Sequence, residues 1–164
     1  MNVLEFKENV KSIYNKYFDG THVSVSMSSK SIYKSIYITF SLAKNLNECI
    51  NHIAMNDMFS ISFQITHNGK EFNRDEFKKH DSMILPENLI IEKKRAFYKI
   101  KPQSKYLVYS SKGVTFRKSK GSAKNILNSL DKFLKRLHDQ LLSDLNNDLI
   151  HNNFIDLVNL RLRK

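Results

Sequence analysis

Hydrophobic and polar positions in the first half of the chain follow the periods of helices and strands in turn. Apolar side chains recur every three to four residues over 3–18, which predicts an amphipathic helix. Alternation within 21–29, 35–42 and 59–66 predicts three strands, each with one apolar face. An amphipathic stretch at 45–55 predicts a short middle helix. These elements favour an α+β fold, with helices on the apolar face of a small antiparallel sheet.

A strand and a hairpin are predicted in the second half. Period-two alternation runs over 89–101, and residues 105–111 and 114–120 predict a β-hairpin that turns at Lys112-Gly113. The alternation in the first of these strands places five side chains on one face: Lys93, Arg95, Phe97, Lys99 and Lys101. Because unpaired cations are costly to bury, we expect this face to be exposed.

The longest apolar stripe belongs to a C-terminal helix. It runs from Ile126 to Leu145, is rich in leucine, and predicts a helix of about 24 residues and about 36 Å that begins at Ser122. We expect this stripe to pack on the sheet, and a homodimer seam through 122–145 is the alternative. The tail, 148–164, fits a helix and a strand equally well.

Net charge is distributed unevenly along the 164 residues. Residues 1–90 hold 10 Lys or Arg and 10 Asp or Glu, whereas residues 91–164 hold 17 and 6, so the second half carries the whole excess of +11. Within it, residues 91–124 hold 11 cations and one carboxylate, that of Glu92. We expect a neutral α/β lobe at 1–90 and a basic lobe at 91–164, as one compact domain or two tightly packed lobes. Clustered cations favour a polyanionic partner.

The basic segment supplies the candidate nucleic-acid-binding residues. They are Lys93, Lys94, Arg95, Phe97, Lys99, Lys101, Lys105, Lys112, Arg117, Lys118, Lys120 and Lys124. The cations would contact backbone phosphates, and Phe97, Tyr106 or Phe116 would stack on bases. Core packing is the competing role for each ring, and Phe97 is the best stacking candidate because its neighbours on the same strand face are charged. Duplex DNA is the expected ligand, ahead of RNA.

A second candidate site is catalytic and consists of a predicted hydrophobic strand followed by the pattern Glu-x-Lys. Glu92 and Lys94 form this pattern, and Asp81 lies eleven residues before Glu92. The arrangement resembles the metal-binding core of the restriction-endonuclease-like nucleases, which implies that Asp81 and Glu92 hold Mg²⁺ while Lys94 helps to activate water. Outside this pattern, the histidines lack ligand spacing, Cys49 is the only cysteine and no glycine-rich phosphate loop occurs, so we expect no cofactor.

Together these features favour a non-enzymatic nucleic-acid-binding protein that grips phosphates through its basic hairpin. The first alternative is an inhibitor that occupies the nucleic-acid site or an acidic surface of a host or defence protein, with the hydroxyl-rich sheet face of the neutral half as its recognition surface. The second alternative is the Mg²⁺-dependent nuclease. Lys, Asn and Ile make up 53 of the 164 residues, which is typical of AT-rich genomes such as those of phages and other mobile elements. A lone cysteine, with no signal peptide or membrane span in the sequence, predicts a cytoplasmic protein without a membrane partner.

Overall fold

The computed structural model describes most of the chain. The described residues are 1–18, 22–27, 33–41, 59–77, 80–100, 107–108 and 114–146. They form two α-helices and an antiparallel sheet, which confirms the predicted α+β class. The middle helix predicted at 45–55, the turn at Lys112-Gly113 and the tail at 148–164 lie outside these residues.

One sheet contains most of the strands. Its members are β1 (His22–Met27), β3 (Ile36–Ser41), β4 (Phe59–His67), β6 (Leu89–Ile100), β7 (Leu107–Val108) and β8 (Ser119–Gly121). The first five follow the order β1-β3-β4-β6-β7, β8 pairs with the other end of β6, and all pairs are antiparallel. The remaining short elements are β2 (Tyr33–Lys34), its separate partner β5 (Phe72–Asn73), and the 3-10 helices η1 (Arg74–Phe77) and η2 (His80–Ser82).

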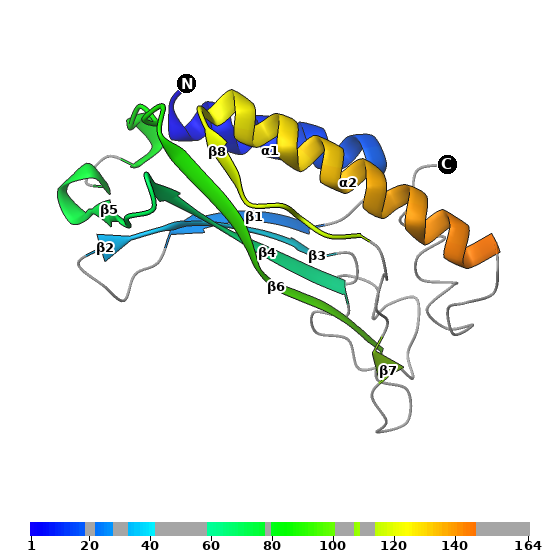
Figure 1. Ribbon diagram of the computed structural model, residues 1–164. Coiled ribbons are helices and arrows are strands. Elements are labelled where there is room, and N and C mark those ends of the chain that lie inside the picture. Colours follow the sequence, from blue (N-terminus) through cyan, green and yellow to red (C-terminus); the bar gives the residue numbers. More distant parts are fainter. Residues whose placement is uncertain are drawn as a thin grey trace.

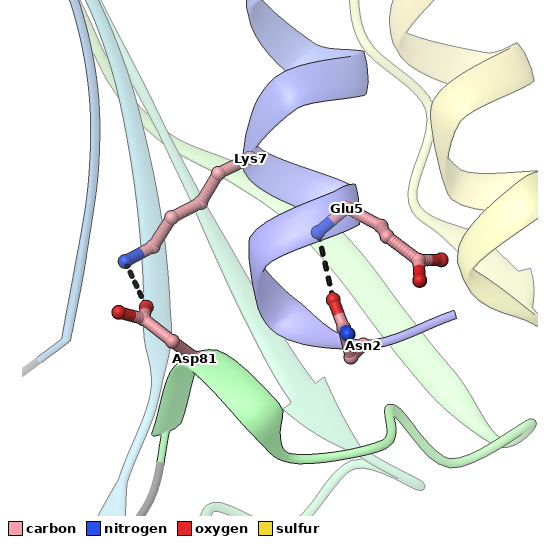
Figure 2. A network of polar contacts seen from close by, with 4 residues as sticks. All are labelled: Asn2, Glu5, Lys7 and Asp81. Atoms are coloured by element: carbon pink, nitrogen blue, oxygen red, sulfur yellow. Dashed lines mark hydrogen bonds and ion pairs between the residues drawn. The ribbon is translucent and has the colours of Figure 1, made fainter.

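Both helices lie against the same face of this sheet (Figure 1). α1 (Val3–Tyr17) begins where the Asn2 side chain accepts a hydrogen bond from the Glu5 backbone amide at 2.8 Å, which is an N-cap contact (Figure 2). α2 (Ala123–Asn146) follows Ser122 and packs beside α1. Among the residues that the structure describes, neither helix is long and apolar enough to cross a membrane.

The core lies between the two helices and the sheet. Its fully buried side chains include Ile36, Ile38 and Phe40 of β3, Ile61, Phe63 and Ile65 of β4, Phe6 and Tyr14 of α1, and Ile126, Leu130 and Leu134 of α2. The apolar stripe of α2 belongs to this core from Ile126 to Leu137, as predicted. A homodimer through 122–145 would therefore have to use other positions of the helix.

The predicted hairpin of 105–111 and 114–120 is wrong in its pairing. Its described strands both pair with β6 instead, so that Val108 lies opposite Lys99 and Gly121 lies opposite Leu89. β6 is 12 residues long and therefore offers one end to β7 and the other to β8. Residues 114–118 belong to no strand. Alternation of apolar and polar residues along a segment indicates a strand, but it does not show which other strand that segment pairs with.

A β-bulge in β6 changes which residues share a face of the sheet. Phe63 of β4 lies opposite Lys93, but the adjacent Ser62 lies opposite Arg95, so Lys94 has no partner position. The prediction that Lys93 and Arg95 lie on one face is therefore wrong. Position 93 is in register with the buried Phe63 on the helix-covered face, whereas position 95 is in register with Ser62 on the opposite face.

β6 also crosses the compositional boundary between residues 90 and 91. It pairs with β4 of the neutral half from Leu89, opposite His67, to Tyr98, opposite Phe59. The neutral and basic halves of the sequence therefore contribute strands to one sheet.

Candidate nucleic-acid interface

The segment 114–118, which precedes β8, is anchored in the core by its apolar residues. The Phe116 ring meets Phe63 and Phe133 edge to face, with ring centroids 4.8 and 5.6 Å apart. Val114 is buried as well. These contacts hold the backbone of the segment alongside α2, although the segment has no strand pairing of its own.

Polar contacts join the same segment to α2. The Arg136 guanidinium donates a hydrogen bond to the Thr115 carbonyl oxygen at 3.1 Å. Where the segment enters β8, the hydroxyls of Ser119 and Ser129 lie 2.6 Å apart, within hydrogen-bond distance. These contacts hold the 114–119 segment against α2, so that the segment and the helix form the two walls of a groove.

A groove lies between these two walls, and we call it the α2 groove. It is lined by Phe116, Arg117, Lys118, Ser119, Ser129, Lys132, Lys135, Arg136 and Asp139. A narrow part of about 170 Å³ near Phe116 adjoins a wider part of about 690 Å³ that is lined by α2 residues and Arg117. The wider part is an open depression, so an anion can approach the cations that line it from solvent.

The lining of the α2 groove is strongly cationic. Five Lys or Arg side chains face one carboxylate, that of Asp139, which gives a local formal charge of +4. All five cations are exposed to solvent. Because they line one groove, their fields add there and attract anions.

Three of these five cations were missed by the sequence interpretation. Lys132, Lys135 and Arg136 lie outside the segment with the highest charge density, on the exposed side of a helix predicted to be structural. Their spacing of three and four residues does indicate one helix face. The missing information was that Arg117 and Lys118 pack beside that face.

Lys93 lies on the helix-covered side of the sheet, apart from the other cations of its strand. Its ammonium group is 5.9 Å from the centroid of the Phe133 ring, which is a cation–π distance. The side chain is half-buried. This contact accounts for a lysine at an inward-facing strand position, because the charge rests on an aromatic face of the core.

Glu92 and Lys94 lie on the sheet face that the helices do not cover. Glu92 is in register with Gln64, and its carboxylate forms an ion pair with the Lys94 ammonium at 2.8 Å. The hydrogen bond from Lys94 lowers the pKa of Glu92, burial opposes this, and the charges of Lys94 and Lys118 lower it further. Glu92 therefore stays ionised and neutralises part of the positive charge near β6 and β8.

The other predicted binding residues are distributed over several places. Lys120 and Lys124 are exposed, in β8 and in the first turn of α2. The backbone of β6 places Arg95, Phe97 and Lys99 opposite Ser62, Ser60 and Val108 respectively. Lys101, Lys105 and Lys112 lie outside the described residues.

The two carboxylates of the nuclease hypothesis have different partners. Asp81 of η2 accepts a hydrogen bond from Lys7 of α1 at 3.0 Å (Figure 2), whereas Glu92 pairs with Lys94. Within the part of the chain that the structure describes, no three His, Cys, Asp or Glu side chains are grouped so that they could hold a metal ion. The contacts of Asp81 and Glu92 therefore do not favour a shared Mg²⁺ site.

The side of α2 that faces α1 carries a balanced polar cluster. Asp131 accepts hydrogen bonds from the Tyr17 hydroxyl at 2.5 Å and from the Lys16 ammonium at 3.0 Å. Burial raises the pKa of Asp131, but the hydrogen bonds from Tyr17 and Lys16 and the charges of Lys16 and Lys135 outweigh it, so the net shift is downward. Burial, the hydrogen bond to Asp131 and the charges of Asp131 and Asp139 raise the pKa of Tyr17 to about 12.

No protein-family model, curated protein or solved structure matches this chain.

Proposed function

We propose that this chain is a non-enzymatic nucleic-acid-binding protein that holds the phosphate backbone, of DNA before RNA, in the α2 groove. The observation that supports the proposal is the convergence of five cations from two separate segments on a groove with one carboxylate. Phosphate oxygens are the natural partners of such a cluster, because Arg and Lys form charge-assisted hydrogen bonds with them.

These cations lie at exposed positions. Lys132 and Lys135 are exposed on α2, and Arg117 is exposed on the opposite wall. Arg136 is different, because its hydrogen bond to Thr115 also joins the two walls. Like charges held close together repel one another, so a cluster without a structural role is best explained by an anionic ligand that it binds.

This proposal moves the binding surface away from the hairpin face predicted from the sequence. Arg117 and Lys118 remain central, and Lys120 and Lys124 extend the basic surface beyond the groove. Lys94 is assigned a smaller part because Glu92 already neutralises it.

A salt titration of binding tests the proposal. Wild-type protein is compared with the triple variant Arg117→Glu/Lys132→Glu/Lys135→Glu on fluorescent DNA and RNA oligonucleotides. On the wild type, log K should fall with log salt by about 0.9 per phosphate contact on duplex DNA and about 0.7 on single strands. The variant should bind at least about 100-fold more weakly at low salt and should lose about two units of slope on a single strand and nearly three on duplex DNA.

A matched control separates groove contacts from net charge. Lys11→Glu/Lys70→Glu/Arg74→Glu makes the same change in charge at exposed positions outside the groove. It should retain most of the affinity and nearly the whole slope. Equal losses in the two triple variants, or a flat salt response of the wild type, would contradict the proposal.

An acidic protein surface is the alternative partner for the same charges, as expected for an inhibitor of a host or defence protein from a phage or mobile element. A pull-down from a bacterial lysate, with and without nuclease, distinguishes the two. Loss of captured material after nuclease supports the nucleic-acid proposal. A partner that survives nuclease and is lost in the groove variant supports the inhibitor instead.

A further inference from the structure

The narrow part of the α2 groove combines an aromatic ring with cations. Phe116 is half-buried and packs edge to face with Phe63 and Phe133, and it lines the groove together with Arg117, Lys132 and other residues. Aromatic rings beside a positively charged track are the usual means of binding single strands, because any base offers a π-face to stack on.

The arrangement of the cations suits one strand between two walls. Arg117 and Lys118 lie on one wall, and Lys132, Lys135 and Arg136 lie on the other. A single backbone in the groove receives positive charge from both sides. A duplex presents a convex surface whose bases are paired inside, so it offers phosphates to the rims of the groove and no base face to Phe116.

We infer that the α2 groove selects a single strand of nucleic acid, with phosphates between its two cationic walls and one base against Phe116. This inference rests on the proposed function and narrows its ligand from the duplex expected from the sequence to a single strand. From Lys132 to Asp139 the helix rises about 10 Å, so the α2 wall is short and contacts only a few nucleotides of a strand.

Three oligonucleotide ligands test the role of the base. They are a 12-nucleotide thymidine strand, a 12-nucleotide abasic strand with the same phosphates, and a 12-base-pair duplex. Wild-type protein should bind the thymidine strand about five-fold or more tightly than the abasic strand, since base stacking on an aromatic residue contributes at least this factor. It should also bind the thymidine strand more tightly than the duplex.

Two protein variants assign the effect to Phe116. Phe116→Leu keeps an apolar side chain against Phe63 and Phe133 but removes the flat ring. Tyr37→Leu is the control, because it removes a half-buried ring that is not part of the α2 groove. The thymidine-to-abasic ratio should fall to about one in Phe116→Leu and stay at the wild-type value in Tyr37→Leu. Thermal unfolding of each variant confirms that the proteins compared are folded.

The outcomes separate the two proposals. If the duplex binds more tightly than the single strand, or if Phe116→Leu is folded and keeps the wild-type ratio, the single-strand inference is wrong while nucleic-acid binding stands. Because affinity for the abasic strand depends on phosphates alone, it should be unchanged in Phe116→Leu, and its loss there would show a structural role for the ring and overturn the inference. If none of the three ligands binds, both proposals fail.

Discussion

The two sides of α2 use charged residues for different purposes. Toward α1, Asp131 accepts hydrogen bonds from Lys16 and Tyr17, so each charge has a partner within the protein. Toward the 114–119 segment, five cations line a groove whose lining holds one carboxylate, that of Asp139. The first arrangement stabilises the packing of two helices, whereas the second adds repulsion to the fold. On this helix, charged residues that are balanced by opposite charges fit a structural role. A cluster of one sign fits a binding role.

Replacing the central acceptor of the balanced side should have the largest effect on stability. Asp131→Asn removes the charge that receives hydrogen bonds from Tyr17 and Lys16 in a half-buried position. We expect the free energy of unfolding, measured by urea denaturation at pH 7, to fall by about 1–2 kcal/mol. Asp139→Asn, on the groove side of the same helix, is the control and should change it by less than about 0.5 kcal/mol because Asp139 is 62% exposed.

The same variant makes a prediction about acid. The pKa of Asp131 in the folded protein lies below its ordinary value, so its stabilisation is present above a pH of about 4 and is lost as pH falls through the folded pKa. The difference in stability between wild type and Asp131→Asn should therefore shrink as the pH is lowered from 7 toward 3. A difference that stays constant over this range would show that Asp131 acts through packing and not through its charge.

Tyr17→Phe should have the second largest effect. It removes one hydrogen bond to Asp131, and we expect a loss of about 1 kcal/mol at neutral pH. Because the pKa of Tyr17 is raised from 10.0 to about 12, the folded state retains the phenol proton where the unfolded state releases it. The Tyr17 contribution is complete below pH 10 and is lost as the pH rises toward 12. Wild type should therefore lose stability over this interval more steeply than Tyr17→Phe, as followed by denaturation at each pH.

Neutralising the groove should change stability less than either of these variants. Arg117→Gln/Lys132→Gln/Lys135→Gln removes three exposed charges that make no ion pair across the α2 groove in the described contacts. The free energy of unfolding should stay within about 0.5 kcal/mol of wild type or rise slightly as repulsion is relieved. A loss above 1 kcal/mol would mean that these cations serve the fold after all, and would remove the contrast between the two sides of α2.

The smallest effect is expected from Glu92→Gln on the uncovered sheet face. Its ion pair with Lys94 is about half exposed, so the loss should be below about 0.5 kcal/mol in thermal or urea unfolding. The variant also tests the nuclease hypothesis when it is compared with the wild type in a plasmid-nicking assay with Mg²⁺. Nicking by the wild type that disappears in Glu92→Gln would assign catalysis to this residue and contradict a purely binding role.

Sequence patterns were most informative where structure depends on near neighbours. The helix predicted at 3–18 is observed at Val3–Tyr17, and the strand predicted at 89–101 is observed at Leu89–Ile100. Both follow from periodicity, which a chain satisfies locally when it buries one face. Period-two alternation assigned the wrong sheet face to residues beyond the β-bulge. The bulge at Lys94 arises from the register between β6 and β4, which the sequence of β6 alone does not reveal.

Part of the binding surface could be anticipated in the same way. Arg117 and Lys118 were identified because positive charge is dense around them. Lys132, Lys135 and Arg136 were not, because a predicted core helix normally carries solvated cations on its outer side. The importance of these residues depends on which segment packs beside them, and that is not encoded in spacing along the helix.

Periodicity and composition were sufficient to predict the α+β class, the positions of both described helices and the concentration of charge in the second half. These properties depend on periodicity and composition, and both can be read from a short segment of the sequence. Three features follow only from the folded chain: β7 and β8 both pair with β6, Lys93 lies against Phe133, and two cationic segments meet in a groove. Such features are set by contacts between residues far apart in the sequence, whose free energies depend on how the whole core packs.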